Sequence, residues 1–251
     1  MKNKSLFLLF VIPAIASFAS EDAIVADRPG FSTGTQTVKP KVVNVELGYQ
    51  YSFNNHDTKQ SSHTLPLMVL RTGLSEKSEL DLLWDGLNVD KEEEQSRVTS
   101  KADLSIGGKY KLYESAQYNL TALGIFSLPT GTYPSTSDSV DPLVGILWDY
   151  ALSDSNTLFG TVQASSSQLD HNRVYDTQFA IGTSISYTQT VGSFLEFYTV
   201  MPSEPTLRDT RVIDGGITYL FTNDTQIDFN IGIGLTKYSS NFIGFGIASR
   251  F

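Results

Sequence analysis

The stretch VNVELGYQYSF at residues 43–53 decides the fold class. Every odd position from Val43 to Phe53 is apolar or aromatic, and every even position is polar or glycine. Side chains alternate between two faces along a β-strand, whereas an α-helix repeats about every 3.6 residues. The stretch therefore predicts a strand with one apolar face and one polar face.

The same period of two recurs up to the C-terminal Phe251. Seven further segments show it clearly, and four segments near 63–72, 118–128, 157–165 and 191–201 show it weakly. We expect about twelve strands, each close to the roughly 9 to 11 residues that a tilted strand needs to cross a bilayer. The pattern near 63–72 and 118–128 does not decide which side chains face the lipid and which face the lumen.

The connectors between these segments alternate in length. The long, polar ones span 54–62, 85–101, 129–141, 165–176 and 202–210, and the short ones span 72–77, 114–117, 153–156, 188–190 and 222–224. Only the last outer connector, 238–241, is short where the pattern predicts a long loop. A soluble β-sandwich also alternates in polarity but has no reason to sort its connectors in this way. The sequence therefore predicts an all-β protein, a closed transmembrane antiparallel β-barrel with short periplasmic turns, longer extracellular loops and both termini in the periplasm.

The composition excludes several chemistries. The 251 residues include 27 acids and 18 bases, a net charge of −9 that disfavours a nucleic-acid partner, because binding phosphates requires clustered Lys and Arg. Charged residues make up only 18% of the chain, against roughly 25% in soluble domains. There is no cysteine, which excludes disulfides, thiolate catalysis and cysteine-ligated metals. We expect no cofactor and no metal site.

The N-terminus has the features of a secretory signal peptide. Lys2 and Lys4 precede an apolar stretch over 6–16 that is shorter than the about 20 residues of a spanning helix, and Ala19 ends a small-residue cleavage motif. We expect a cleaved signal peptide at 1–19, a periplasmic N-terminal segment at 20–41 and the barrel at 42–251. Export of such a chain predicts the outer membrane of a Gram-negative bacterium.

Aromatic side chains on the apolar face gather near the ends of the segments. This sorting predicts two girdles at the membrane interfaces, because aromatic rings suit the level of the lipid headgroups. The outer girdle contains Tyr51, Phe53 and Trp84, and the periplasmic girdle contains Tyr110, Trp148, Tyr150, Tyr187, Tyr219 and Phe251.

The polar face supplies the residues that we expect to line the lumen. Toward the periplasm it places Glu46, Glu79, Asp81, Lys109, Lys111, Asp149, Asp228 and Arg250, and higher up it places Asp103, Glu196 and Asp214. One interpretation is a structural network of ion pairs that fills a narrow barrel, since buried charges need partners. The other is a constriction that prefers cations or guides a substrate, because acids outnumber bases, and both interpretations can hold together.

Residues 20–41 allow two interpretations. In one they form a disordered periplasmic leader. In the other, Asp27 and Arg28 belong to a partial plug, with Arg28 paired to an acid of the lumen.

Four motifs together resemble a family of Gram-negative outer-membrane proteins. They are Ala26-Asp27-Arg28-Pro29-Gly30, VNVELGYQYSF at 43–53, LRTGLSEKSELDLLW at 70–84 and LPTG at 128–131. The label of this family is "putative meta-pathway of phenol degradation", and its members are often called transporters. The resemblance implies passive uptake of aromatic or other hydrophobic compounds, and it carries no catalytic motif. The terminal Phe251 also resembles the signal read by the barrel-assembly machinery, which would be a partner together with the bilayer and its lipopolysaccharide.

Two other classes of function remain as alternatives. A barrel with a closed lumen could be structural, or a receptor or adhesin that acts through its loops. A barrel hydrolase would need a Ser–His pair on the lipid face or acids with a His at the outer rim. His56, His63 and His171 all fall in or beside expected long loops, and none falls on an expected lipid-facing position. The sequence therefore predicts that the protein is not an enzyme.

Overall fold

The computed structural model describes residues 23–54, 56, 59–169 and 172–251. The predicted signal peptide lies outside the described residues, as do Asp170 and His171. No helix among the described residues is long and apolar enough to cross a membrane.

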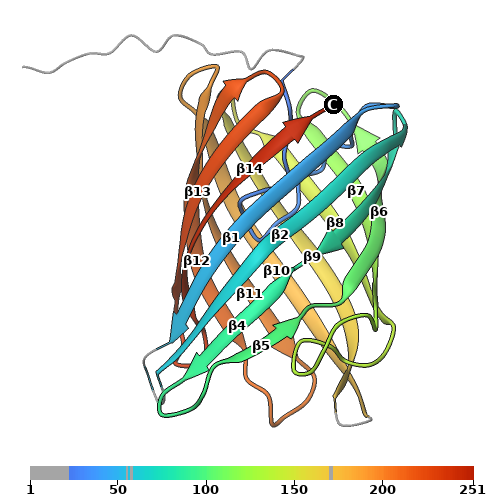
Figure 1. Ribbon diagram of the computed structural model, residues 1–251. Helices are drawn as coiled ribbons and strands as arrows, with labels where there is room; N and C mark the ends of the chain where they lie inside the picture. The colour runs from blue at the N-terminus through green and yellow to red at the C-terminus, as the bar shows by residue number, and fades with distance from the viewer. Residues whose placement is uncertain (1–22, 55, 57–58, 170–171) are drawn as a thin grey trace, which may run out of the picture.

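The described residues form one antiparallel sheet (Figure 1). Its strands are β1 (Val43–Asn54), β2 (Gln60–Ser75), β3 (Ser78–Trp84), β4 (Leu87–Glu92), β5 (Val98–Lys101), β6 (Leu104–Glu114), β7 (Tyr118–Leu128), β8 (Asp141–Ala151), β9 (Asn156–Leu169), β10 (Asn172–Ser186), β11 (Val191–Pro202), β12 (Thr210–Thr222), β13 (Thr225–Gly234) and β14 (Asn241–Arg250).

The sheet closes on itself into a barrel of 12 strands. Strand β1 pairs with β2 on one side and with β14 on the other, from Asn44 opposite Arg250 to Phe53 opposite Asn241. Closure leaves no edge of the barrel wall unpaired, as a bilayer requires. The predicted fold class, strand number and arrangement of short turns and long loops are confirmed.

Two of the expected long loops are largely strand instead. The connector 85–101 folds into β4 and β5, and β4 pairs with the outer part of β2 beyond the end of β3. The described residues of the connector 165–176 are strand, because β9 runs to Leu169 and β10 starts at Asn172. Beyond the bilayer a strand needs no apolar face, so its polar sequence has the appearance of a loop. Figure 1 shows these extensions at the end opposite the C-terminus.

Strand β2 changes its facing midway. Gly48 of β1 pairs with Leu67 of β2, and the next pair is Gln50 with Thr64. The pairing thus moves by two residues along β1 and by three along β2. Such a bulge reverses which positions face outward. It turns Arg71 into the lumen and His63 to the outer face, where its ring lies 4.9 Å from that of Tyr51. The expectation that no histidine occupies an outward strand position was therefore wrong for His63.

The lumen is less polar than the alternation predicts. Leu123, Leu147 and Val212 belong to the lumen-facing layer and are buried. The residues next to them in sequence include outward apolar side chains, so the sheet is apolar on both faces at these positions.

The aromatic residues expected at the membrane interfaces lie on the outside. Tyr110, Tyr150, Tyr187, Tyr219 and Phe251 are exposed, whereas Tyr51, Phe53, Trp84 and Trp148 are half-buried. Trp148 packs against the backbone of Gly160, and the Trp84 indole donates to the carbonyl of Ala102 at 3.1 Å. Their role at the lipid headgroups stays a prediction.

Candidate functional site

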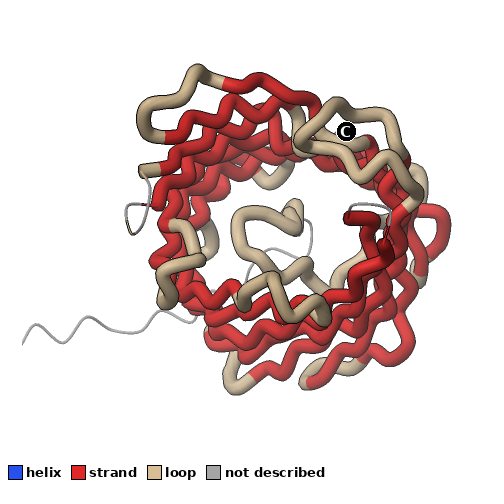
Figure 2. The backbone as a smooth tube through the Cα atoms, turned by 90° about the horizontal axis from the view of Figure 1, so that it is seen from below, coloured by secondary structure: helices blue, strands red, loops and turns tan. Residues whose placement is uncertain are grey.

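The candidate site is the lumen together with the N-terminal segment, defined here as residues 23–42. Seen along the barrel axis, irregular backbone lies inside the ring of strands (Figure 2). The N-terminal segment enters beside the β12–β13 turn, where the amide of Ile24 donates to the carbonyl of Asn223 at 2.7 Å. It leaves along β2, where Gly73 donates to the carbonyl of Val42 at 3.3 Å. Between these points it contacts β1, β2, β3, β6, β7, β8, β11 and β13.

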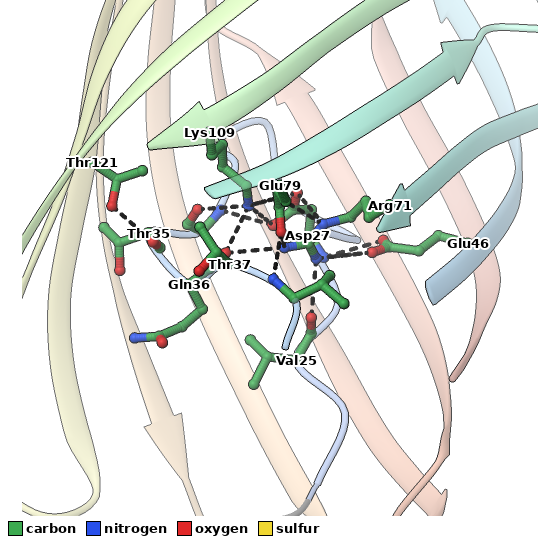
Figure 3. Close-up of polar contacts among 12 residues, drawn as sticks. Val25, Asp27, Thr35, Gln36, Thr37, Glu46, Arg71, Glu79, Lys109 and Thr121 are labelled. Carbon is green, nitrogen blue, oxygen red and sulfur yellow. Dashed lines mark hydrogen bonds and ion pairs between the residues drawn. The ribbon is translucent and has the colours of Figure 1, made fainter. Parts of the chain in front are cut away.

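Arg71 is the centre of the contacts (Figure 3). Its guanidinium lies 3.2 Å from a carboxylate oxygen of Glu46, 3.0 Å from one of Glu79 and 3.2 Å from one of Asp27. It also donates to the carbonyl of Val25 at 3.0 Å. Its side chain is only 1% exposed, so one buried cation joins two wall acids to the N-terminal segment.

Lys109 supplies a second buried cation from β6. Its Nζ lies 2.9 Å from Asp27 and 3.0 Å from Glu79, and it donates to the carbonyls of Gly34 and Gln36 at 3.1 and 2.9 Å. Charges removed from water are stabilised only when partners of opposite charge and hydrogen bonds replace the solvent. Both requirements are met at Lys109 because the N-terminal segment folds back beside it.

Three wall carboxylates accept hydrogen bonds from the backbone of the N-terminal segment. Glu46 accepts from Asp27 and Arg28 at 3.1 Å each, and Glu79 accepts from Val38 at 2.5 Å. Glu196, on the far side of the barrel, accepts from Phe31 at 2.8 Å and from Ser32 at 3.1 Å. These bonds satisfy amides that have no strand partner.

Arg28 lies against a flat part of the wall. A Cβ atom at Gly48 or Gly246 would collide with its guanidinium, so these two glycines make room for it. Its Nη2 lies 3.3 Å from Asp228, and the neighbouring carbonyl of Pro29 accepts from Asn230 at 3.0 Å.

The tip of the N-terminal segment is a loop over residues 28–33, which we call the lumen loop. Its two ends lie together, because Gly34 donates to a carboxylate oxygen of Asp27 at 3.3 Å. At its tip the ring of Phe31 stacks on Tyr198 with a centroid distance of 4.1 Å. Beyond the loop, the hydroxyl of Thr35 donates to Asp149, and Thr121 donates to the carbonyl of Thr35 at 2.8 Å.

The structure brings most of the predicted lumen residues together around the N-terminal segment. Those in contact with it are Glu46, Glu79, Lys109, Asp149, Glu196 and Asp228, with Asp27 and Arg28 on the segment itself. Asp81 faces inward opposite Arg71, and Asp214 lies beside Glu196 with no hydrogen-bond partner among the described residues.

Three of the predicted residues lie elsewhere. Asp103 accepts from Thr130 and Gly131, at 2.9 and 2.7 Å, and so holds the extracellular loop 129–140. Lys111 pairs with Glu114 at 2.7 Å, and Arg250 pairs with Asp224 at 2.5 Å, both at the periplasmic rim.

Arg71 is the central residue that the sequence did not identify. It lies within LRTGLSEKSELDLLW, in the strand whose facing was open. The available sign was a lone arginine inside an expected membrane strand, where a charge facing lipid costs about 2 to 4 kcal/mol.

Fold and site together define a class of protein, an outer-membrane β-barrel whose lumen holds its own N-terminal segment. The chain belongs to the family described as "Putative MetA-pathway of phenol degradation", whose model matches residues 26–251.

Solved structures show the same fold at low sequence identity. An outer membrane channel from Pseudomonas putida F1 is 13% identical, with a TM-score of 0.71 over 89% of this chain and 99% of that one. The NanC porin is 6% identical, with a TM-score of 0.56 over 82% and 98% of the two chains. The KdgM porin is 7% identical, with a TM-score of 0.53 over 82% and 99%. No curated protein matches this chain by sequence. The protein is thus an outer-membrane barrel, and the three solved structures named above are a channel and two porins.

Proposed function

We propose that the protein is an outer-membrane channel for the passive uptake of small solutes that are hydrophobic or aromatic. The observation that carries the proposal is that the lumen keeps open space although the N-terminal segment lies inside it. A cavity of about 310 Å³ remains between the segment and strands β8 to β12. A barrel of this size is wider than the eight-stranded type, whose side chains fill it.

The lining of the lumen supports hydrophobic cargo. Phe159 and Phe194 line the cavity from the wall, and the wall charges nearest the periplasm are mostly paired with the N-terminal segment. An apolar solute therefore meets few charged groups that it would have to desolvate. The alternative of a structural or receptor-type barrel with a closed lumen predicts no effect on uptake.

Uptake by intact cells tests this proposal. Cells that lack the protein should take up labelled aromatic solutes more slowly at low external concentration, and expression from a plasmid should restore the rate. Uptake of a small sugar serves as the control and should not change. Unchanged uptake across a panel of aromatic solutes would contradict the channel and favour the closed barrel.

We also propose that the protein is not a hydrolase. His63 on the outer face is the one described histidine that a barrel lipase could use, and Ser61 lies two residues away on the same face. The ring of His63 is 2.7 Å from the hydroxyl of Tyr49, and no hydrogen bond joins it to Ser61 among the described residues. A nucleophile without a base within hydrogen-bond reach is not activated.

An activity assay checks this. Purified protein should release no more fatty acid from phospholipid vesicles, and no more product from a peptide substrate, than the heat-denatured sample. Turnover that His63→Ala abolishes and Asn54→Ala leaves intact would show that the protein is an enzyme.

A further inference from the structure

The outer face of the barrel changes abruptly from apolar to basic at the extracellular rim, the end opposite the C-terminus in Figure 1. In β13 the outward Ile233 and the following Leu235 are exposed, and Lys237 comes next in the loop to β14. In β4 Val89 lies opposite the outward His63, and Lys91 follows it on the same face. Outward apolar residues mark the part of a barrel that faces hydrocarbon. The first bases beyond them therefore lie at the level of the lipid headgroups.

A groove with a volume of about 510 Å³ lies on this rim. The aromatic part of its wall consists of Tyr51 and Phe53, whose ring centroids are 5.7 Å apart, and Lys59 and Lys91 line it as well. Lys91 is opposite Ser61, which is in turn opposite Phe53, so these side chains project from one face of the sheet. The groove thus combines an aromatic wall with two amino groups on the outer face of the barrel.

The bases of the groove are balanced by two acids, Glu93 and Glu94. Glu93 pairs with Lys59 at 3.0 Å, but the side chains are 44% and 71% exposed. Water competes for such a pair, so it contributes little to stability. Lys59 can therefore exchange this carboxylate for a phosphate at little cost.

The excess positive charge lies beside the groove, at Lys237 and Arg208. The side-chain amide of Asn54, the residue after Phe53, donates to the carbonyl of Lys237 at 2.9 Å and so holds the two regions together. Nζ of Lys237 lies 4.9 Å from the centre of the Tyr238 ring, and Cζ of Arg208 lies 6.0 Å from it. Two cations beside one ring repel each other, and an anion bound by both lowers that repulsion. A phosphate can accept charge-assisted hydrogen bonds from such a pair.

We propose that this rim is a binding site for lipid A, the phosphorylated anchor of lipopolysaccharide. Its residues are Tyr51, Phe53, Lys59, Lys91, Arg208 and Lys237. Lipid A joins several acyl chains to a disaccharide that carries two phosphates, so one phosphate can lie at each pair of bases while an acyl chain lies against the aromatic wall. A free phosphate would need no aromatic wall, and an uncharged lipid would need no bases. The inference concerns the outer face of the barrel and does not depend on the proposed uptake function.

Native mass spectrometry of the purified protein in detergent, titrated with bis-phosphorylated lipid A, tests the site. Lipid A should bind, and the same lipid without its phosphates should have a Kd at least about tenfold higher, because the charge-assisted bonds are lost. Phosphatidylglycerol, which has a single phosphate, should also bind at least about tenfold more weakly. Arg208→Gln with Lys237→Gln should raise the Kd of lipid A about tenfold, and Lys59→Gln with Lys91→Gln should have a similar effect.

Lys41→Gln with Lys77→Gln is the matched control. Both lysines are exposed at the periplasmic rim, so this variant loses the same charge on the opposite side of the membrane and should keep the Kd unchanged. The four bases of the site are exposed too, so their variants should fold. A Kd that either pair of substitutions leaves unchanged, or that the control raises equally, would overturn the site. Equal binding of lipid A with and without its phosphates would also overturn it, and equal binding of phosphatidylglycerol would overturn the assignment to lipid A.

Discussion

Arg71→Met is expected to lower the free energy of unfolding of the barrel by about 3 to 5 kcal/mol. The substitution keeps most of the side-chain volume and removes the charge that faces Glu46, Glu79 and Asp27. Both wall carboxylates are 0% exposed at the side chain, so water cannot replace the guanidinium without opening the lumen. The cost arises mainly from acids that stay buried with too few partners. Denaturant unfolding in detergent or lipid, followed by tryptophan fluorescence, measures it.

Arg211→Met is the matched control. Arg211 pairs with Asp209 at 2.8 Å, but both side chains are exposed, 52% and 41%. Exposed pairs contribute about 0 to 1 kcal/mol, so the control should unfold close to the unchanged protein. Equal losses for the two variants would show that the buried cluster does not hold the barrel together.

Excision of the lumen loop, residues 28–33, is expected to raise the single-channel conductance several-fold. The cut ends can join because Gly34 already bonds to Asp27 at 3.3 Å, so Asp27 can keep its contacts with Arg71 and Lys109. Removal of the loop also frees Glu196 and Asp228, which now bind Phe31, Ser32 and Arg28. The opened lumen should therefore prefer cations, as measured by the reversal potential in a salt gradient.

A deletion of equal length from an extracellular loop, residues 204–209, is the control. It leaves the N-terminal segment in place and should keep the conductance near that of the full chain. If excision of the lumen loop leaves conductance unchanged, the loop does not obstruct the lumen. A preference for anions after excision would show that the freed acids do not line the ion path.

The barrel could be predicted because its outer face must be apolar wherever lipid touches it. This constraint makes the alternation from Val43 to Phe53 complete, and β13 shows it equally well. It fails in β2, where the bulge beside Gly48 reverses the facing between Leu67 and Thr64. A period of two cannot be followed through such a point. For this one reason Arg71 was not identified as a lumen residue and the outward facing of His63 was missed.

The lumen could be predicted only in part. Polar positions such as Glu46 and Glu196 were identified because they alternate with apolar neighbours. In β7 the inward Leu123 is as apolar as the outward Phe126, so no alternation shows which side faces lipid. The path of the N-terminal segment has no periodicity at all. It depends on contacts such as Phe31 with Glu196, 165 residues apart, which no local pattern encodes.

The most direct test of the central claim, that the N-terminal segment is bound inside the lumen, is hydrogen exchange of its amides in the unmodified protein. Val38, Phe31, Ser32, Asp27 and Arg28 donate to wall carboxylates, so peptides covering 26–38 should stay protected long after the extracellular loop 203–209 has exchanged. Arg71→Met should abolish much of that protection while the amides of β13 remain protected. Complete exchange of residues 26–38 at the earliest time point in the unmodified protein would contradict the account.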